Sequence, residues 1–114
     1  MRSKSLAILV VFGMVFFAAL AVANQNKGAA DMMLDGGTKG NIPFPHLKHQ
    51  ENLKDCNVCH DLFPQSPGSI NVLKAEGKLE KKQVMNKLCT KCHKAEKAAG
   101  KTSGPTTCAS CHVK

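Results

Sequence analysis

The sequence has no tryptophan and no tyrosine, and it has few of the aliphatic residues that normally fill a protein interior. Of the 91 residues that follow the first 23 in this 114-residue chain, Leu, Ile, Val and Phe account for 15, or about 16%. A charged chain with less than about 20% of these residues is expected to stay disordered on its own. This scarcity excludes a side-chain core of the usual size and predicts that a non-protein group fills the interior.

Aromatic residues are also missing between the lysines, which bears on the positive charge of the chain. The segment after residue 23 has 14 basic residues, the total of 16 less Arg2 and Lys4, against 8 acidic ones, so its formal charge is +6. A basic balance is typical of nucleic-acid or membrane binding. Base stacking needs aromatic side chains, however. We therefore expect no nucleic-acid partner, and either an acidic cofactor or an acidic protein would offset the charge.

The N-terminus is typical of an export signal. Arg2 and Lys4 precede an apolar run over 6–22 that ends at a small-x-small cleavage site closing with Ala23. We predict cleavage after Ala23 and no stable membrane association afterwards. The alternative is a retained anchor, which the marginal length of the run disfavours. The predicted domains are 1–23, a cleaved signal peptide, and 24–114, a single small domain.

Cysteine occurs only in three copies of one motif, Cys-x-x-Cys-His. The three copies are Cys56, Cys59 and His60; Cys89, Cys92 and His93; and Cys108, Cys111 and His112. On a helical turn, residues i and i+3 lie close enough for both thiols to add to the vinyl groups of one haem. The histidine that follows then presents its imidazole to the iron. The sequence therefore predicts three covalently bound c-type haems.

Paired cysteines have other uses, namely a structural zinc site, a thioredoxin-like redox pair or a disulfide framework. Zinc would explain the pairs but not the histidine after every second cysteine. A disulfide framework would not repeat the motif either. Three repeats of a rare residue at one spacing therefore favour covalent haem, and an export signal suits haem attachment outside the cytoplasm.

Three irons need six axial ligands, and the chain has five histidines, three of them in the motifs. The other two, His46 and His49, follow Pro45, which suits the first turn of a helix. On that helix the two imidazoles would stand one turn apart on nearly the same face. An exposed polar turn is the ordinary interpretation of such a pair, but three irons without second ligands favour ligation. One ligand is then still missing.

Met85 is the candidate for this sixth ligand. The pattern over 79–97 predicts a helix with one face formed by Leu79, Met85, Leu88, Cys89 and Cys92. Because the helix runs straight into Cys89, on the proximal side of the second haem, Met85 cannot easily reach the opposite face of that haem. It must serve another iron or fill the interior, which is the usual role of methionine.

Together these features resemble the triheme cytochrome c7 family, small relatives of the tetrahaem class III cytochromes c3. The resemblance covers nearly all of 24–114: a predicted pair of strands within 31–44, a Phe-x-His-x-x-His segment beginning at Phe44, and the three motifs. It implies a small, mainly α protein with little regular secondary structure, a short N-terminal two-stranded hairpin, and short helices wrapped around three covalently bound haems. Met32 and Met33, the rivals of Met85, lie in a predicted strand.

In that family both axial ligands of every iron are histidines. The ligand pairs that the resemblance implies are His46 with His60, His49 with His93, and Met85 with His112. Met85 stands where the family has its third distal histidine, four residues before the second motif, so this chain departs from the family at one iron. A second departure is the segment 61–88, which is longer than in the family.

This ligation predicts the function. An iron with two protein ligands has no free position for a substrate and can only change its oxidation state. We therefore expect an electron carrier rather than an enzyme, a monomer whose exposed lysines within 78–101 attract other redox proteins with acidic docking surfaces. An ordinary solvated helix face is the alternative for these lysines. The resemblance implies a periplasmic location and transfer between inner-membrane and outer-membrane cytochromes in anaerobic or metal-reducing respiration.

A thioether ligand favours ferrous iron relative to a second imidazole, so the haem of Met85 is expected to have the highest potential. The alternative function depends on the same residue. If Met85 packs in the interior, the third haem has an open position and the protein could be an enzyme that reduces peroxide, nitrite or a metal oxyanion. The sequence has no obvious acid or base for such chemistry. A zinc-bound or haem-storage module is a third alternative, without reversible redox behaviour.

Overall fold

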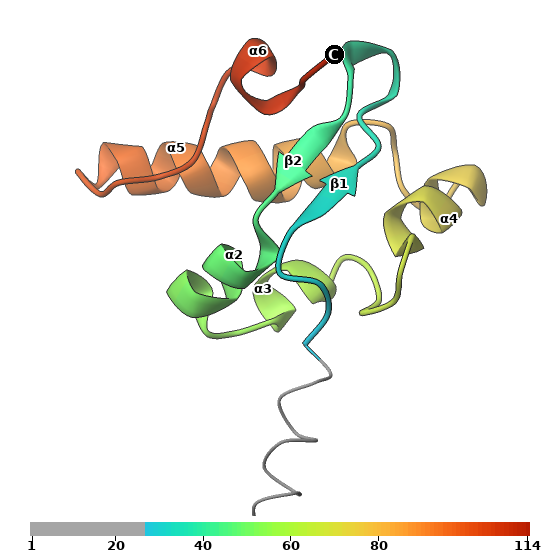
Figure 1. The fold of residues 1–114 in the computed structure, drawn as a ribbon, viewed down its shortest axis with the longest axis horizontal. Coiled ribbons are helices and arrows are strands. Elements are labelled where there is room, and N and C mark those ends of the chain that lie inside the picture. The colour runs from blue at the N-terminus through green and yellow to red at the C-terminus, as the bar shows by residue number, and fades with distance from the viewer. Residues whose placement is uncertain (1–26) are drawn as a thin grey trace, which may run out of the picture.

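The computed structural model describes residues 27–114, so the predicted signal peptide and its cleavage site lie outside the described residues. The elements in chain order are β1 (Met32–Leu34), a 3-10 turn (Gly37–Lys39), β2 (Ile42–Phe44), α2 (His46–Leu53), α3 (Asn57–His60), α4 (Ser69–Ala75), a π-helical turn (Met85–Cys89), α5 (Thr90–Ala98) and α6 (Cys108–Cys111). Figure 1 shows α5 crossing behind the hairpin, with α2 and α3 on one side and α6 on the other. Among residues 27–114, no helix is long and apolar enough to cross a membrane.

The hairpin pairs β1 with β2 in antiparallel register, with Met32 opposite Phe44 and Leu34 opposite Ile42. These four side chains are half-buried, while Met33 and its partner Pro43 are exposed. Such alternation is what a strand with one covered face requires. The predicted strand pair within 31–44 is therefore confirmed, and so is the strand position of Met32 and Met33.

Very few side chains are buried in the described part of the chain. Leu79, at 6% exposure, is the only buried hydrophobic residue there, and Ser69, at 9%, is the only buried polar one. The hydroxyl of Ser69 donates to the carbonyl of Pro64 at 2.9 Å. The shortage of aliphatic residues in the sequence predicted this lack of a side-chain core.

The helix that carries the second motif begins later than the sequence predicted, and it is not uniform. Helical backbone starts at Gln83 instead of Leu79, passes through the π-helical turn and continues as α5. Leu79 lies in the preceding loop, where its N–H donates to the carbonyl of Leu73 in α4. A π turn holds one residue more than an α turn, so it rotates the residues before it by about 100° relative to those after it. Because Leu79 lies outside this helix, the prediction that it shares a helix face with Met85, Cys89 and Cys92 was wrong, and the turn also rotates Met85 relative to Cys92.

The segment 61–88 contains a helix of its own. A turn at Ser66–Gly68, where Gly68 adopts a φ of +72°, leads into α4. The chain then reverses at Gly77, because the N–H groups of Lys78 and Leu79 both donate to the carbonyl of Leu73 at 2.8 and 3.2 Å. This closure seals the end of α4 and places Leu79 in the interior.

We expect Leu79→Ala to lower the free energy of unfolding by about 2 kcal/mol or more, because it removes the one buried aliphatic side chain of the described region. Denaturant unfolding followed by far-ultraviolet circular dichroism measures the loss. The matched control is Val72→Ala on α4, whose side chain is 53% exposed and whose truncation should cost less than about 0.5 kcal/mol. Equal losses in the two variants would contradict the assignment of Leu79 to a core.

Candidate functional site

Each Cys-x-x-Cys-His motif forms one helical turn. In the first motif the N–H of His60 donates to the carbonyl of Cys56 at 3.0 Å, and in the third that of His112 donates to Cys108 at 2.9 Å. The second motif lies within the longer helix, at the junction of the π-helical turn and α5. Each turn therefore places two cysteines, three residues apart, on the same side of the backbone, as attachment to one haem requires.

One cysteine from each of the other two motifs, Cys59 and Cys111, lies near Cys89. None of the six forms a disulfide. Burial raises the pKa values of the Cys59, Cys89 and Cys111 thiols. Cys92 raises the pKa of Cys59 further, while Cys59 and Cys111 do the same for Cys89. Thiols of different motifs thus lie close enough to interact electrostatically. Among residues 27–114, no three His, Cys, Asp or Glu side chains come together as ligands of one metal ion.

The structure brings His46 of α2 opposite His60 of α3. Their ring centroids are 6.3 Å apart, and the ring planes meet at 79°. Two imidazoles on opposite sides of one metal ion, each bonded at about 2.0 Å, have centroids about 6 Å apart. The separation of the two rings therefore fits a single iron between them.

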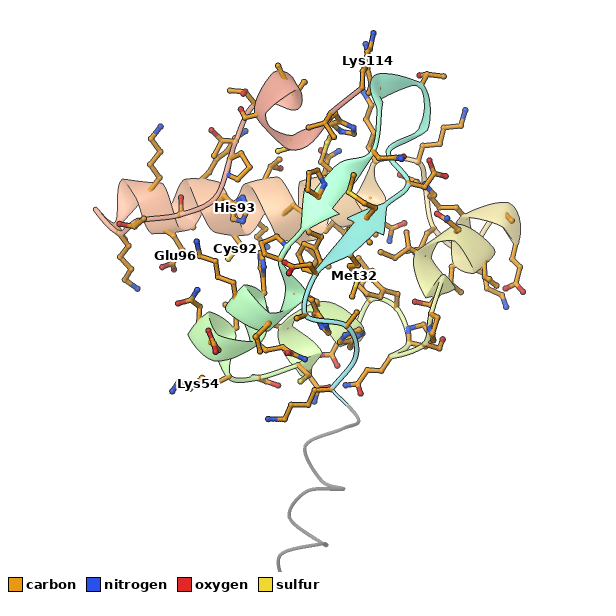
Figure 2. The ribbon with its side chains drawn as sticks, viewed as in Figure 1. Met32, Lys54, Cys92, His93, Glu96 and Lys114 are labelled. Atoms are coloured by element: carbon orange, nitrogen blue, oxygen red, sulfur yellow. The ribbon has the colours of Figure 1, made fainter. Side chains whose placement is uncertain are left out.

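The structure also brings His49 of α2 opposite His93 of α5, with ring centroids 6.1 Å apart. Figure 2 shows His93 beside Cys92 on the same helix. The ring of Phe44 packs against His49 at 4.4 Å between centroids and fixes its orientation. Both predicted histidine pairs are thus in place, one turn apart on α2, and the ligation of iron by them stays a prediction.

The Nδ1 atoms of all five histidines form hydrogen bonds to backbone carbonyls. These bonds join His46 to Ala29 at 3.0 Å, His49 to Pro45 at 2.8 Å, His60 to Phe63 at 3.2 Å, His93 to Pro105 at 2.7 Å, and His112 to Gly40 at 2.8 Å. A carbonyl oxygen only accepts, so each Nδ1 carries the hydrogen and each Nε2 keeps a lone pair. Histidines that bind metals are held in this way, which fixes the ring and raises the basicity of the ligating nitrogen.

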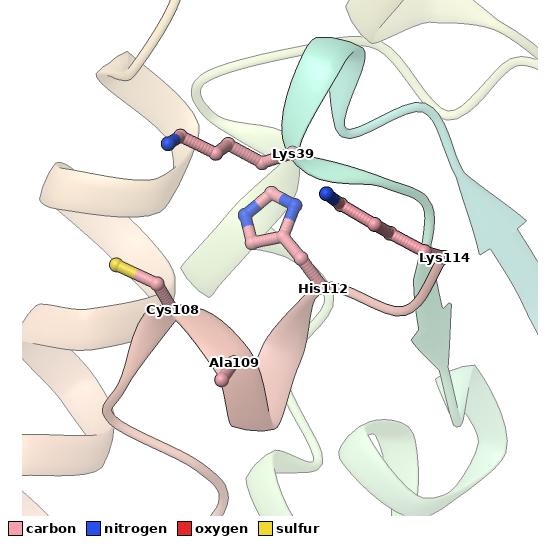
Figure 3. Close-up of a pocket in the computed structure, with 5 residues that line it drawn as sticks. All are labelled: Lys39, Cys108, Ala109, His112 and Lys114. Atoms are coloured by element: carbon pink, nitrogen blue, oxygen red, sulfur yellow. The ribbon is translucent and has the colours of Figure 1, made fainter.

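The third motif lies against the hairpin at the C-terminal end of the chain. The N–H of Val113 donates to the carbonyl of Asn41 at 2.8 Å, next to the bond from His112 to Gly40. A cavity of about 310 Å³ opens beside this motif, lined by Lys39, Cys108, Ala109, His112 and Lys114. Figure 3 shows the His112 ring between the side chains of the two lysines. The surroundings of this site are therefore positively charged.

Met85, the predicted sixth ligand, is half-buried at the start of the π-helical turn. Its carbonyl accepts hydrogen bonds from both the backbone N–H and the side-chain hydroxyl of Thr90, the latter at 3.0 Å. Its rival Met33 is 60% exposed in β1. The pairing of Met85 with His112 stays a prediction.

Comparison with known proteins identifies the family. The family model described as cytochrome c7 and related cytochrome c matches residues 42–113, which include all three motifs and both additional histidines. A cytochrome c7 from Geobacter metallireducens is 34% identical over 102 residues, covering 88% of each chain. This chain belongs to the cytochrome c7 family. A cytochrome c3 from Desulfuromonas acetoxidans is 33% identical over 85 residues, covering 75% of this cytochrome and all of that protein.

Solved structures support the same assignment for the fold. The solution structure of the triheme cytochrome PpcA from Geobacter sulfurreducens has a TM-score of 0.53 at 34% identity, covering 75% of this cytochrome and all of that chain. The cytochrome c7 PpcB from the same organism has a TM-score of 0.51 at 35% identity, with the same coverage. The predicted family and fold class are confirmed. The chain is a multihaem electron-carrier cytochrome, and its three motifs provide for three covalent c-type haems.

Sequence reasoning missed two glycines that border histidine rings of this cytochrome. A Cβ atom added to Gly104 would lie 2.7 Å from Nε2 and 2.9 Å from Nδ1 of His93, and one added to Gly36 would lie 2.5 Å from Nδ1 of His112. Real Cβ atoms essentially never come within 3.0 Å of such atoms. Only glycine lets the backbone approach the imidazoles this closely. The one signal in the sequence is that Gly104 directly precedes Pro105, whose carbonyl holds His93.

We expect Gly104→Ala to displace the imidazole of His93 and so to shift the low-spin electron paramagnetic resonance signal of the second haem. Overpacking of this kind costs about 1 to 3 kcal/mol of stability. The matched control is Gly77→Ala, where the added Cβ meets nothing within 4 Å but the φ of +71° strains the backbone. The control should lose about 1 kcal/mol and keep every haem signal. Identical spectra for Gly104→Ala and the unaltered protein would contradict the close contact.

Proposed function

We propose that this cytochrome carries electrons in the periplasm, with two bis-histidine haems and one haem bound by histidine and methionine. The proposed ligand pairs are His46 with His60, His49 with His93, and Met85 with His112. By similarity to the family, its partners are inner-membrane and outer-membrane cytochromes of an anaerobic or metal-reducing respiratory chain. The proposed mature protein is a monomer that begins at Asn24, after removal of the signal peptide.

The observation that carries this proposal is the geometry of the two histidine pairs. Their centroid separations of 6.3 and 6.1 Å equal, within a few tenths of an ångström, the spacing that one iron imposes on two axial imidazoles. In addition, the Nδ1 hydrogen bonds leave every Nε2 free to bind. Neither feature is expected of histidines that merely lie on a surface.

Haem iron held between two protein ligands exchanges single electrons and has no open position for a substrate. The role of the protein is then to hold both ligands in place during oxidation and reduction. The carbonyls that accept from Nδ1 do this, because a ring fixed by a hydrogen bond needs little rearrangement. A site that changes little between two oxidation states suits rapid electron transfer.

Two observations support Met85 as the second ligand for His112. Four of the five histidines already form two pairs, so His112 is left without a histidine partner. The π-helical turn also rotates Met85 relative to Cys92, one of the two cysteines of the second motif. The third haem is the one that remains.

The surface charge supports an acidic partner. Lys78 pairs with Glu76 at 2.7 Å, and Lys101 pairs with Glu96 at 3.3 Å, in exposed pairs that contribute little stability. Within the described residues, no ion pair involves the exposed lysines 81, 82, 87, 91, 94 and 97. Together with Lys39 and Lys114 beside His112, they give the haem-bearing helix and the third site a positive surface. Such a surface steers acidic proteins and does so less at high salt.

Mass spectrometry of the protein exported by a host with haem-maturation machinery tests the location and the cofactor count together. We expect the mass of residues 24–114 plus three haems, because every motif supplies two thiols. Replacing both cysteines of the third motif with alanine should remove the mass of one haem and leave the other two. Retention of residues 1–23 would contradict the predicted cleavage. An added mass that corresponds to zinc instead of haem would contradict the predicted cofactor.

Substitution of Met85 tests the third ligand pair. We expect the oxidised protein to show a weak near-infrared sulfur-to-iron band that Met85→His removes, with a fall in the highest of the three reduction potentials. Met85→Ala should open one coordination position, so that the reduced variant binds carbon monoxide while the unaltered protein does not. Met33→Ala is the control and should change nothing, because Met33 is exposed in β1.

The same measurements decide between a carrier and an enzyme. Carbon monoxide binding by the unaltered protein would mean an open position at one haem and would favour the enzymatic alternative. An unchanged spectrum and unchanged potentials in Met85→His would exclude Met85 as a ligand.

A further inference from the structure

The second haem-binding motif contains a threonine with an unusual hydrogen bond. Thr90 follows Cys89 directly, and its hydroxyl donates to the carbonyl of Met85, five residues earlier, at 3.0 Å. A threonine hydroxyl in a helix normally reaches a carbonyl three or four residues back. The backbone N–H of Thr90 donates to the same carbonyl of Met85. One residue thus supplies two donors to the single acceptor that defines the π-helical turn.

The expanded turn is confined to this place in the helix. Immediately before it, the N–H of Asn86 donates to the carbonyl of Lys82 at 2.9 Å, which is the ordinary α-helical spacing. After it, α5 runs as a regular helix from Thr90 to Ala98. A carbonyl oxygen has two lone pairs, so it accepts from both groups of Thr90 at once. The hydroxyl therefore stabilises the π turn relative to an α turn, in which the N–H of Thr90 would bond to Asn86 instead.

The π turn determines where Met85 points. In an unbroken α-helix, Met85 would precede Cys89 by four residues and Cys92 by seven, so all three would lie on one side. The extra residue in the turn rotates Met85 by about 100° relative to Cys92, which follows the turn. Met85 is thereby offset from Cys92, one of the two cysteines of the second haem motif. The other two motifs have asparagine and alanine, Asn57 and Ala109, at the position of Thr90.

We infer that Thr90 is a positioning residue, whose hydroxyl holds the π-helical turn and so directs the sulfur of Met85 to the iron of the third haem. This inference rests on the proposed ligation of that haem by Met85. Thr90 then belongs to the motif that attaches the second haem but acts on the ligand of the third. One helix therefore carries residues for two haems, and a single hydroxyl determines how the residues before Cys89 are rotated relative to those after it.

Thr90→Val tests the inference, because valine keeps the shape of threonine and removes the hydroxyl. We expect the variant to lose the near-infrared sulfur-to-iron band, to bind carbon monoxide at one haem when reduced, and to show a lowered highest potential. Thr90→Ser keeps a hydroxyl and should retain all three properties of the unaltered protein. The matched control is Thr102→Val, an exposed threonine outside the motifs. A mass with three haems and unchanged signals from the bis-histidine haems establish that each variant is folded.

Met85→Ala, measured beside these variants, separates the two proposals. If Met85→Ala loses the sulfur band but Thr90→Val keeps it, the role of Thr90 is overturned and the ligation by Met85 stands. If Thr90→Ser loses the band as Thr90→Val does, the hydroxyl is not the cause and the inference is again overturned. A sulfur band that is missing from the unaltered protein, or unaffected by Met85→Ala, overturns both.

Discussion

The hydrogen bond from Nδ1 of each histidine to a backbone carbonyl is the interaction on which the arrangement of this cytochrome depends. Only two of the five acceptors are close in sequence to their histidine, Pro45 to His49 and Phe63 to His60. The other three join distant segments, across 12 residues for Pro105 and His93, 17 for Ala29 and His46, and 72 for Gly40 and His112. The bonds that orient the imidazoles therefore also fasten the N-terminal segment to α2, the hairpin to the C-terminus, and the segment after α5 to α5 itself. The same hydrogen bonds therefore determine both how the segments are held together and how the imidazoles are oriented.

A chain with so few aliphatic residues has little else to hold it together. Leu79 is the only buried hydrophobic side chain in the described region. The two phenylalanines there pack against histidines, Phe44 against His49 and Phe63 against His60. In most domains the site is an addition to a core that would fold without it. The described region has no such core. Substitutions near the five histidines are therefore expected to change stability and redox properties together, including those at Gly36 and Gly104, where the backbone approaches an imidazole closely.

The three sites differ in their surroundings, which gives the protein a direction that three identical haems would not have. The first two histidine pairs share α2, whose consecutive turns present one ligand each to α3 and α5. The third motif stands apart at the hairpin, between Lys39 and Lys114. Positive charge stabilises reduced iron relative to oxidised iron, in the same sense as a thioether ligand. If Met85 ligates the third haem as proposed, ligand type and local charge both favour the third site as the place where an electron resides longest.

The sequence by itself determined what is local and covalent: three haem motifs, the histidine pair one turn apart on α2, the strand pair within 31–44, and the shortage of core residues. These follow from spacing along a helix or strand and from side-chain chemistry, so no tertiary information is needed to predict them.

Only the tertiary structure decided which carbonyl holds each imidazole and which glycines border the rings, because those partners lie up to 72 residues apart. The tertiary structure also decided how the helical residues before Cys89 are rotated relative to those after it. A π turn and an α turn differ in which carbonyl accepts from one N–H, and the hydrophobic pattern over 79–97 fits a regular helix. The prediction of one continuous helix face that begins at Leu79 was therefore wrong. The proposed effect of the Thr90 hydroxyl, which donates to the carbonyl of Met85, is to favour the π turn.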